Sequence, residues 1–176
     1  GLVGSEMCIR DSFIMIKGIM YQEDITLINT YTPNHGALKY IEQLLTEIKE
    51  KIDQNTIIVG NVNTPLSDMD RPSKQKINRE TTSVNDTLAN WIIDIYRAFH
   101  PQIVAYTLFF SAHGTFSRTD HILRHRDSLN KYKRAEIIPT IFSDHNALKL
   151  EINRKKKARR TTVSYTHLRA HETDQY

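Results

Sequence analysis

The chain has 176 residues, of which 39% are hydrophobic and 9% aromatic. This length suits one domain with a hydrophobic core and is too short for two. The formal charge is +4, and no apolar run approaches the roughly 18 residues that a membrane helix needs. The single cysteine, Cys8, excludes an intrachain disulfide and a thiol metal site. The composition therefore predicts a globular domain without a membrane partner.

The chain begins with a predicted hairpin and a helix. Residues 13–17 are apolar and are expected to end as a strand at Gly18, and residues 24–31 form a second strand rich in β-branched side chains. The short spacing between them favours antiparallel pairing. From Ala37 to Ile52, apolar residues recur every three or four positions, which predicts an amphipathic helix of about four turns.

The next segment predicts a short strand that is buried on both faces. Residues 56–59 are Thr, Ile, Ile and Val, and Gly60 then allows a turn. Asn61 and Asn63 follow, two positions apart and therefore on one side of the backbone, before Pro65 stops the strand. A hairpin, a helix and a buried strand together indicate a layered α/β fold.

The second half of the chain predicts mainly strands. Residues 66–80 are polar and are expected to form an exposed connection, and Ser83 could cap a short helix. Further strands are predicted over residues 105–110, 115–123, 135–141 and 147–152, the first two as a hairpin and the third as an edge strand because of its proline.

Both ends of the chain lack the patterns of folded protein. Residues 1–12 and 163–176 show no hydrophobic period, cap or turn signal, and they resemble translated adapter or cloning sequence. We expect both to be artefactual, and the natural chain to extend beyond both junctions.

The positive charge is concentrated near the C-terminal end. Residues 13–153 hold 16 basic and 16 acidic side chains, whereas six of the seven residues 154–160 are basic. Such a run binds phosphate backbones, acts as a nuclear address or is a solvated linker. We treat residues 154–162 as a basic linker.

Three polar clusters stand at the ends of predicted strands. They are Asn61 with Asn63, Asp120 with His121, and Ser143-Asp144-His145. Each cluster alone is more often structural, because asparagines favour turns and a lone Asp-His pair is usually a satisfied hydrogen bond.

Taken in order, these motifs resemble the endonuclease/exonuclease/phosphatase superfamily. Residues 13–153 more closely resemble the endonuclease domain that opens the polyprotein of LINE-type (non-LTR) retrotransposons, which also contains a reverse transcriptase. The resemblance implies a partial domain, namely the C-terminal part of a two-sheet α/β sandwich flanked by helices, with the N-terminal strands missing. The segments that carry it are 29–34, 60–66, 94–97, 100–101, 106–107, 110–111, 120–122 and 143–145.

The resemblance also implies an activity. The family hydrolyses a DNA phosphodiester with Mg²⁺ and leaves a 3′-hydroxyl that primes reverse transcription, so DNA is the expected partner and the nucleus and cytoplasm the expected locations. His145 would contact the scissile phosphate and Asp120 would orient His145. Tyr31 and Asn63 would help to place the phosphate and the attacking water.

Two further groups of residues take family roles. Asp144 would lie near the metal or the phosphate. Residues 107–118 would form a hairpin that probes the DNA minor groove, with Thr107, Ser117 and Arg118 as its DNA-binding residues. The oligomeric state and the target sequence are left open.

Two departures from the family pattern predict a loss of activity. Asn61 stands where the family has an aspartate that aligns the nucleophilic water or accepts a proton from it, and an amide cannot act as a base. The metal-binding glutamate of the family would lie on strands that precede this chain. We therefore expect a truncated chain that neither nicks DNA nor folds robustly.

Two alternatives remain open. One is a non-catalytic DNA-binding module that uses the basic run and the 107–118 hairpin. The other is a different branch of the superfamily, such as an abasic-site repair nuclease or a lipid or inositol phosphatase. The match over residues 78–101, away from the chemistry, argues against this second alternative.

Overall fold

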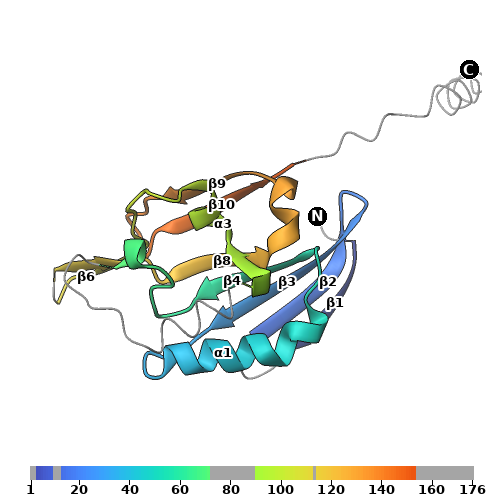
Figure 1. The fold of residues 1–176 in the computed structure, drawn as a ribbon, viewed down its shortest axis with the longest axis horizontal. Helices are drawn as coiled ribbons and strands as arrows, with labels where there is room; N and C mark the ends of the chain where they lie inside the picture. The colour runs from blue at the N-terminus through green and yellow to red at the C-terminus, as the bar shows by residue number, and fades with distance from the viewer. Residues whose placement is uncertain (1–2, 10–12, 72–89, 113, 154–176) are drawn as a thin grey trace, which may run out of the picture.

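The computed structural model describes residues 3–9, 13–71, 90–112 and 114–153, and Figure 1 shows their arrangement. A six-stranded sheet forms the centre of the molecule, with the strand order β1-β2-β3-β4-β8-β5. All neighbouring strands in it are antiparallel except β3 and β4, which are parallel. The strands are β1 (Val3–Ile9), β2 (Phe13–Met20), β3 (Glu23–Tyr31), β4 (Thr56–Asn61), β5 (Ile92–Asp94) and β8 (Asp120–His125).

The first hairpin confirms the predicted pairing of the two N-terminal strands. β2 continues through Gly18 to Met20, so the expected end of the strand at Gly18 is wrong, because Gly18 keeps its partner Ile25 across the pair. Tyr21 and Gln22 form the two-residue turn with φ values of 55° and 65°, as tight hairpins require. β1, within the segment set aside in the sequence, pairs with β2 at the edge of the sheet.

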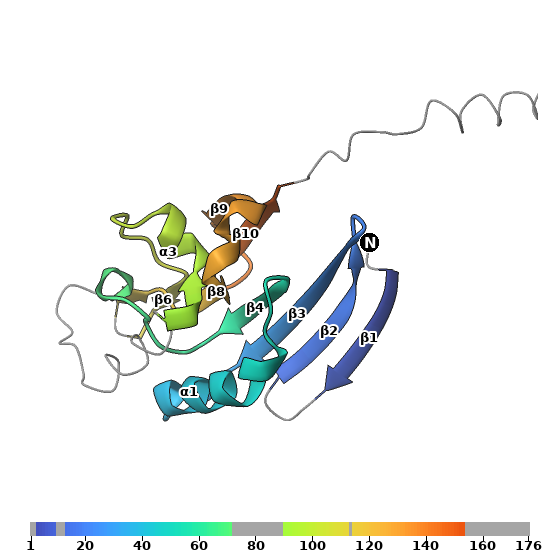
Figure 2. The same ribbon diagram turned by 45° about the vertical axis from the view of Figure 1, so that its right-hand side comes forward.

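The helix α1 (Ala37–Ile48) covers one face of this sheet (Figure 2). Its apolar positions are buried against Phe13, Met15, Ile28 and Ile58 of the strands. Burying each such side chain contributes about 1.5–3 kcal/mol, so this layer is a main source of stability. The predicted helix is confirmed, and a 3-10 turn over Lys49–Lys51 extends it.

The opposite face carries a second, two-stranded antiparallel sheet of β9 (Tyr132–Ile138) and β10 (Ala147–Ile152). Ala135 and Tyr132 of β9 share a cluster with Ile25, Ile57 and Ile122 of the main sheet. β10 has its predicted bounds, and β9 ends directly before Pro139. The helix α3 (Ile95–Phe99) packs into the same cluster, and a 3-10 segment over Arg126–Lys131 joins β8 to β9.

A small hairpin of β6 (Leu108–Phe110) and β7 (Thr115–Ser117) extends from one end of the molecule (Figure 1). The sequence predicted one strand over residues 115–123, but the chain leaves the hairpin at Arg118 and Thr119 and enters the main sheet at Asp120. Two antiparallel ladders therefore replace one, because the segment pairs with β6 on one side of this break and with β4 on the other.

The connection after β4 is less exposed than predicted. Leu66 and Asp70 are buried, and a 3-10 turn spans Asp68–Asp70. The rest of that connection, the helix expected to begin at Ser83 and the basic linker 154–162 lie outside the described residues. Within the described part of the chain, no helix has the length and apolar character needed to cross a membrane.

Candidate functional site

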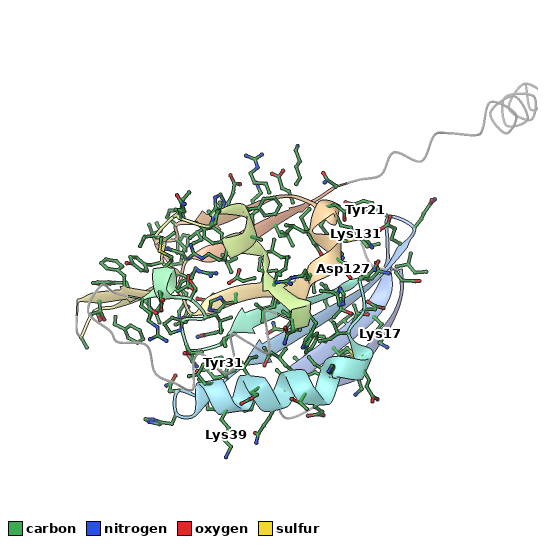
Figure 3. The ribbon with its side chains drawn as sticks, in the orientation of Figure 1. Lys17, Tyr21, Tyr31, Lys39, Asp127 and Lys131 are labelled. Atoms are coloured by element: carbon green, nitrogen blue, oxygen red, sulfur yellow. The ribbon has the colours of Figure 1, made fainter. Side chains whose placement is uncertain are left out.

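Three of the residues singled out in the sequence form one row across the main sheet. Tyr31 at the end of β3 is the register partner of Asn61 at the end of β4, and Asn61 is the partner of Asp120 at the start of β8. Directly opposed residues have Cα atoms about 4.5–5.5 Å apart and point to the same face. Tyr31 is exposed and lies close to the start of α1, as Figure 3 shows.

His145 joins this row from a different part of the chain. Its Nδ1 atom lies 2.8 Å from Oδ2 of Asp120 and donates a hydrogen bond to it. Nε2 of His145 makes no hydrogen bond to any residue that the structure describes. The predicted pairing of Asp120 with His145 is therefore present, with the second ring nitrogen available to a bound group.

Asn61 and Asn63 are held by a local network at the end of β4. Oδ1 of Asn61 accepts a hydrogen bond from the backbone N–H of Asn63 at 2.8 Å, and Nδ2 of Asn63 donates to the carbonyl of Thr32. Asn63 adopts a left-handed backbone with φ of 50°, which asparagine tolerates better than most residues. The strand can approach β3 here because residue 60 is glycine: a Cβ atom on Gly60 would lie 1.8 Å from the carbonyl oxygen of Thr30.

The loop that carries Asp144 and His145 is fixed to the β6 strand. The N–H of Phe109 donates to the carbonyl of Asp144 at 3.2 Å, and the N–H of Asn146 donates to the carbonyl of Thr107 at 2.7 Å. The Asp144 side chain is exposed and accepts from Ser143 Oγ at 3.3 Å. Asp144 thus stands next to the Asp120–His145 pair with its carboxylate open to solvent.

The three residues predicted to contact DNA are buried, and that prediction is corrected. Thr107 and Arg118 have no exposed surface, and Ser117 is 8% exposed. The hydroxyl of Thr107 accepts from the N–H groups of Thr119 and Asp120, so it fixes the start of β8. Side chains that are buried and hydrogen-bonded inside the protein cannot reach a DNA groove from this structure.

Arg118 is the centre of a buried ion-pair network on the other side of β8. Its guanidinium donates to Asp70 at 2.7 Å and 3.1 Å and to Asp94 at 2.6 Å. His121 donates through Nδ1 to Asp94 at 2.8 Å, and its Nε2 lies 3.2 Å from the carbonyl of Thr64. Both ring nitrogens face acceptors, so both contacts are hydrogen bonds only when the imidazole carries two protons.

The electrostatics of this network keep Asp94 ionised. Burial by itself would raise the pKa of Asp94, but the hydrogen bond and charge of His121 and the charge of Arg118 hold that pKa well below its ordinary value of 3.8. Burial would likewise lower the pKa of Arg118, yet the charges of Asp94 and Asp70 raise it. The network is thus a set of mutually stabilised charges.

Among the described residues, one group of three side chains has the spacing of metal ligands. Asp70, Asp94 and His121 offer ligand atoms within 4.8 Å of one another, and they are the only such group of three in the described part of the chain. Arg118 already donates to both carboxylates, so a cation at that position would have to displace a buried guanidinium. The expected Mg²⁺ therefore does not fit this cluster.

Sequence reasoning missed the buried network. Asp94 and Arg97 belonged to a motif of the resemblance, and Asp94 accepts from the N–H of Arg97 at the start of α3. Asp70 carried no signal, because its partner Arg118 is 48 residues away in the chain. No sequence pattern marks an acid on a polar connection as buried, so nothing in the sequence indicated Asp70.

Comparison with solved structures identifies the fold, although the sequence matches no protein-family model. An AP endonuclease from Archaeoglobus fulgidus superposes with a TM-score of 0.70 at 18% identity, covering 88% of this chain and 72% of that chain. The endonuclease domain of TRAS1, a telomere-specific non-LTR retrotransposon, gives 0.67 at 15% identity, covering 86% and 70%. The 3′ phosphatase NExo from Neisseria, bound to a product DNA hairpin, gives 0.64 at 18% identity, covering 88% and 72%.

These neighbours agree with the architecture described above. Two sheets in contact, a helix on the outer face of the larger sheet and polar residues at the ends of β3, β4 and β8 make up the mixed α/β structure. The chain has the fold of the endonuclease/exonuclease/phosphatase proteins.

Proposed function

We propose that this chain is a truncated DNA phosphodiesterase domain of the retrotransposon endonuclease type that is inactive because of Asn61. The observation that carries the proposal is the alignment of Tyr31, Asn61 and Asp120 across three strands, with His145 hydrogen-bonded to Asp120. The fold is shared with AP endonucleases and with a retrotransposon endonuclease domain, which supports this class of reaction.

His145 is suited to stabilise charge on a phosphate. Asp120 accepts the Nδ1 proton and fixes the orientation of the ring, so Nε2 can donate a hydrogen bond to a phosphate oxygen when the ring is protonated. A donor that is already oriented before the reaction stabilises developing charge without the cost of reorganisation. The exposed Tyr31 hydroxyl, one strand beyond Asn61, can bind another phosphate oxygen.

Asn61 limits the reaction through the direction of its amide. Oδ1 accepts the N–H of Asn63. The other polar group of the side chain is the amide Nδ2, which only donates hydrogen bonds. A water molecule beside it finds no acceptor for its proton. An aspartate at the same position would keep the contact to Asn63 and present its second oxygen to that water.

The test is nicking of supercoiled plasmid by the full chain in the presence of Mg²⁺, with a chelator control. We expect the natural sequence to give no nicking above the background rate. Asn61→Asp should accelerate nicking by on the order of 10²-fold, the low end of what general base catalysis contributes. In the Asn61→Asp background, His145→Ala should remove the activity.

Two results would contradict the proposal. Asn61→Asp could leave the rate unchanged although the protein folds, or nicking could persist in the Asn61→Asp, His145→Ala double variant. If both variants bind DNA without any nicking, the non-catalytic DNA-binding alternative is favoured instead. Preferential cleavage of abasic DNA would favour the repair-nuclease alternative.

A further inference from the structure

A pocket of about 400 Å³ lies at the end of the main sheet opposite the candidate site. β3 begins at Glu23 in the wall of this pocket and ends at Tyr31 in the candidate site, a length of roughly 25 Å. Figure 3 shows Tyr21 and Lys131, which line the pocket, close together and far from Tyr31. We name it the far-end pocket.

Arg124 supplies a buried positive charge to the far-end pocket. The residue is 2% exposed and lines the pocket. Its guanidinium donates to Oγ of Ser128, to the hydroxyl of Tyr132 and to the carbonyl of Gln54. All of these acceptors are neutral, and within the described residues no carboxylate forms an ion pair with Arg124. A guanidinium has five N–H groups, so donors remain for a further acceptor.

The charge of Arg124 lacks the counter-charge that a buried cation normally has. Arg118, which is buried to a similar degree, donates to two carboxylates. Burial lowers the pKa of Arg124 to about 10, and the charges of Asp53 and Glu23 only partly oppose this shift. Arg124 therefore remains protonated at neutral pH. An anion in the far-end pocket would provide the missing counter-charge.

Lys131 brings a second cation to the same pocket. Its ammonium group donates to Oδ1 of Asn55, again a neutral acceptor, and the side chain is partly exposed. It forms no ion pair with any residue that the structure describes. Two cations in one pocket match a phosphate monoester, which carries a charge of about −1.5 to −2 at pH 7. A carboxylate would balance only one of them.

The remaining walls of the far-end pocket suit a ligand with an apolar part. They contain the side chains of Met20, Ile25, Ile57 and Ile152. Apolar walls with a few convergent polar groups, and a volume of this size, are typical of sites for small molecules.

Two acids restrict the size of what can enter. Glu23 and Asp24 line the far-end pocket and are exposed. A nucleic-acid backbone has a phosphate at every nucleotide, so these acids would repel the part of a backbone that stays outside the pocket. A small molecule with a single, enclosed phosphate avoids this repulsion.

We propose that the far-end pocket binds a small phosphate monoester, with its phosphate group against Arg124 and Lys131 and its apolar part against the aliphatic wall. This site is separate from the one proposed for the DNA phosphodiester and does not depend on it. Its walls come from the β2–β3 turn, the start of β4 and the start of β9. A bound ligand would therefore also stabilise the folded chain against unfolding.

The experiment uses phenyl phosphate as the probe, titrated into the full-length chain at pH 7.5 and followed by calorimetry. Inorganic phosphate and benzoate are the comparison ligands. We expect phenyl phosphate to bind more tightly than either by on the order of 10-fold, since only it combines a buried ring with a doubly charged group. In NMR spectra, the Nε–H signal of Arg124 should shift over the same concentration range.

The variants separate the far-end pocket from the overall charge of the chain. Lys131→Gln removes one cation but keeps a group that can donate to Asn55, and it should weaken binding of phenyl phosphate by on the order of 10-fold. Arg124→Lys keeps the buried charge without the forked donors and should weaken binding similarly. Lys133→Gln is the matched control, because Lys133 is 67% exposed on the same strand and does not line the pocket. It should bind as the natural chain does.

Four results would overturn the proposal. Equal losses in Lys131→Gln and Lys133→Gln would show attraction by overall charge alone. Phenyl phosphate that binds no more tightly than inorganic phosphate would exclude the apolar wall, and equal binding of benzoate would exclude the preference for phosphate. A shift of the His145 ring signals without one at Arg124 would place the ligand in the candidate site. All four leave the proposed function intact, since nicking by Asn61→Asp is measured separately.

Discussion

Two consecutive residues of β8, Asp120 and His121, each belong to an Asp–His pair. Asp120 pairs with His145, and His121 pairs with Asp94. In both pairs, Nδ1 of the histidine lies 2.8 Å from an aspartate oxygen. Successive residues of a strand point to opposite faces, so β8 holds one pair on each side.

The surroundings of the two pairs differ in every other respect. The His145 and Asp120 side chains are 32% and 20% exposed, whereas those of His121 and Asp94 are 0% and 11% exposed. His121 uses its second nitrogen on the carbonyl of Thr64, and Asp94 also accepts from Arg118. A histidine with both nitrogens satisfied inside the protein supports structure, and one with an exposed nitrogen can act on a ligand. The Asp-His motif alone does not distinguish them.

The largest expected effect is on the buried side of this comparison. Arg118→Met keeps much of the volume of the side chain but leaves Asp70 paired with Arg97 alone and Asp94 paired with His121 alone. Removing one partner of a buried ion pair costs about 3–5 kcal/mol in the free energy of unfolding. Urea denaturation followed by circular dichroism would measure this loss.

Arg134→Met is the matched control for Arg118→Met. Arg134 is 52% exposed and forms ion pairs with Glu136 and Glu151, and exposed pairs of this kind contribute about 0–1 kcal/mol. Equal losses in the two variants would show that the Arg118 network has no special role in stability.

The second prediction compares the substitution of His121 by glutamine with the same substitution of His145. His121→Gln removes the bond to Asp94 or to Thr64 inside the protein, and an unsatisfied buried polar group costs about 1–3 kcal/mol. His145→Gln alters a partly exposed pair and should cost less than about 1 kcal/mol.

The activities should follow the opposite order. In the Asn61→Asp background, His145→Gln should lose nicking, and His121→Gln should retain it at temperatures where the variant remains folded. Thermal unfolding and plasmid nicking measured on the same preparations would test this. A stable but inactive His121→Gln variant would mean that the two faces of β8 are coupled.

The spacing of apolar residues predicted the main helix and strands, because these elements depend on residues that are close together in the chain. The 3.6-residue period gave α1, and the alternation of apolar residues gave β10 with its bounds. The break at Arg118 and Thr119 was missed, since it arises where one segment pairs with two different sheets. Pairing of that kind depends on contacts that are distant in the sequence.

The site was predicted in part and for a similar reason. Ordered motifs indicated Asp120 and His145, and the structure places these two within hydrogen-bonding distance. Arg118 was interpreted as a DNA-binding residue because the resemblance implies a DNA-probing hairpin there and arginine suits a narrow minor groove. Its burial depends on Asp70 and Asp94, which stand 48 and 24 residues away.

The smallest expected effect is a change in stability that appears only at acidic pH. The pKa of Asp94 is lower in the folded protein than its ordinary value of 3.8, so the stabilisation it contributes is fully present above that value. It is lost as the pH falls from 3.8 towards the folded pKa, because the unfolded chain then binds more protons than the folded one. The asparagine side chain in Asp94→Asn binds no proton in this pH range. The difference in unfolding free energy between the natural chain and Asp94→Asn should therefore shrink between pH 5 and about pH 2.5. Urea midpoints at intermediate pH values would measure it, and a constant difference would show that Asp94 is not held ionised by His121 and Arg118.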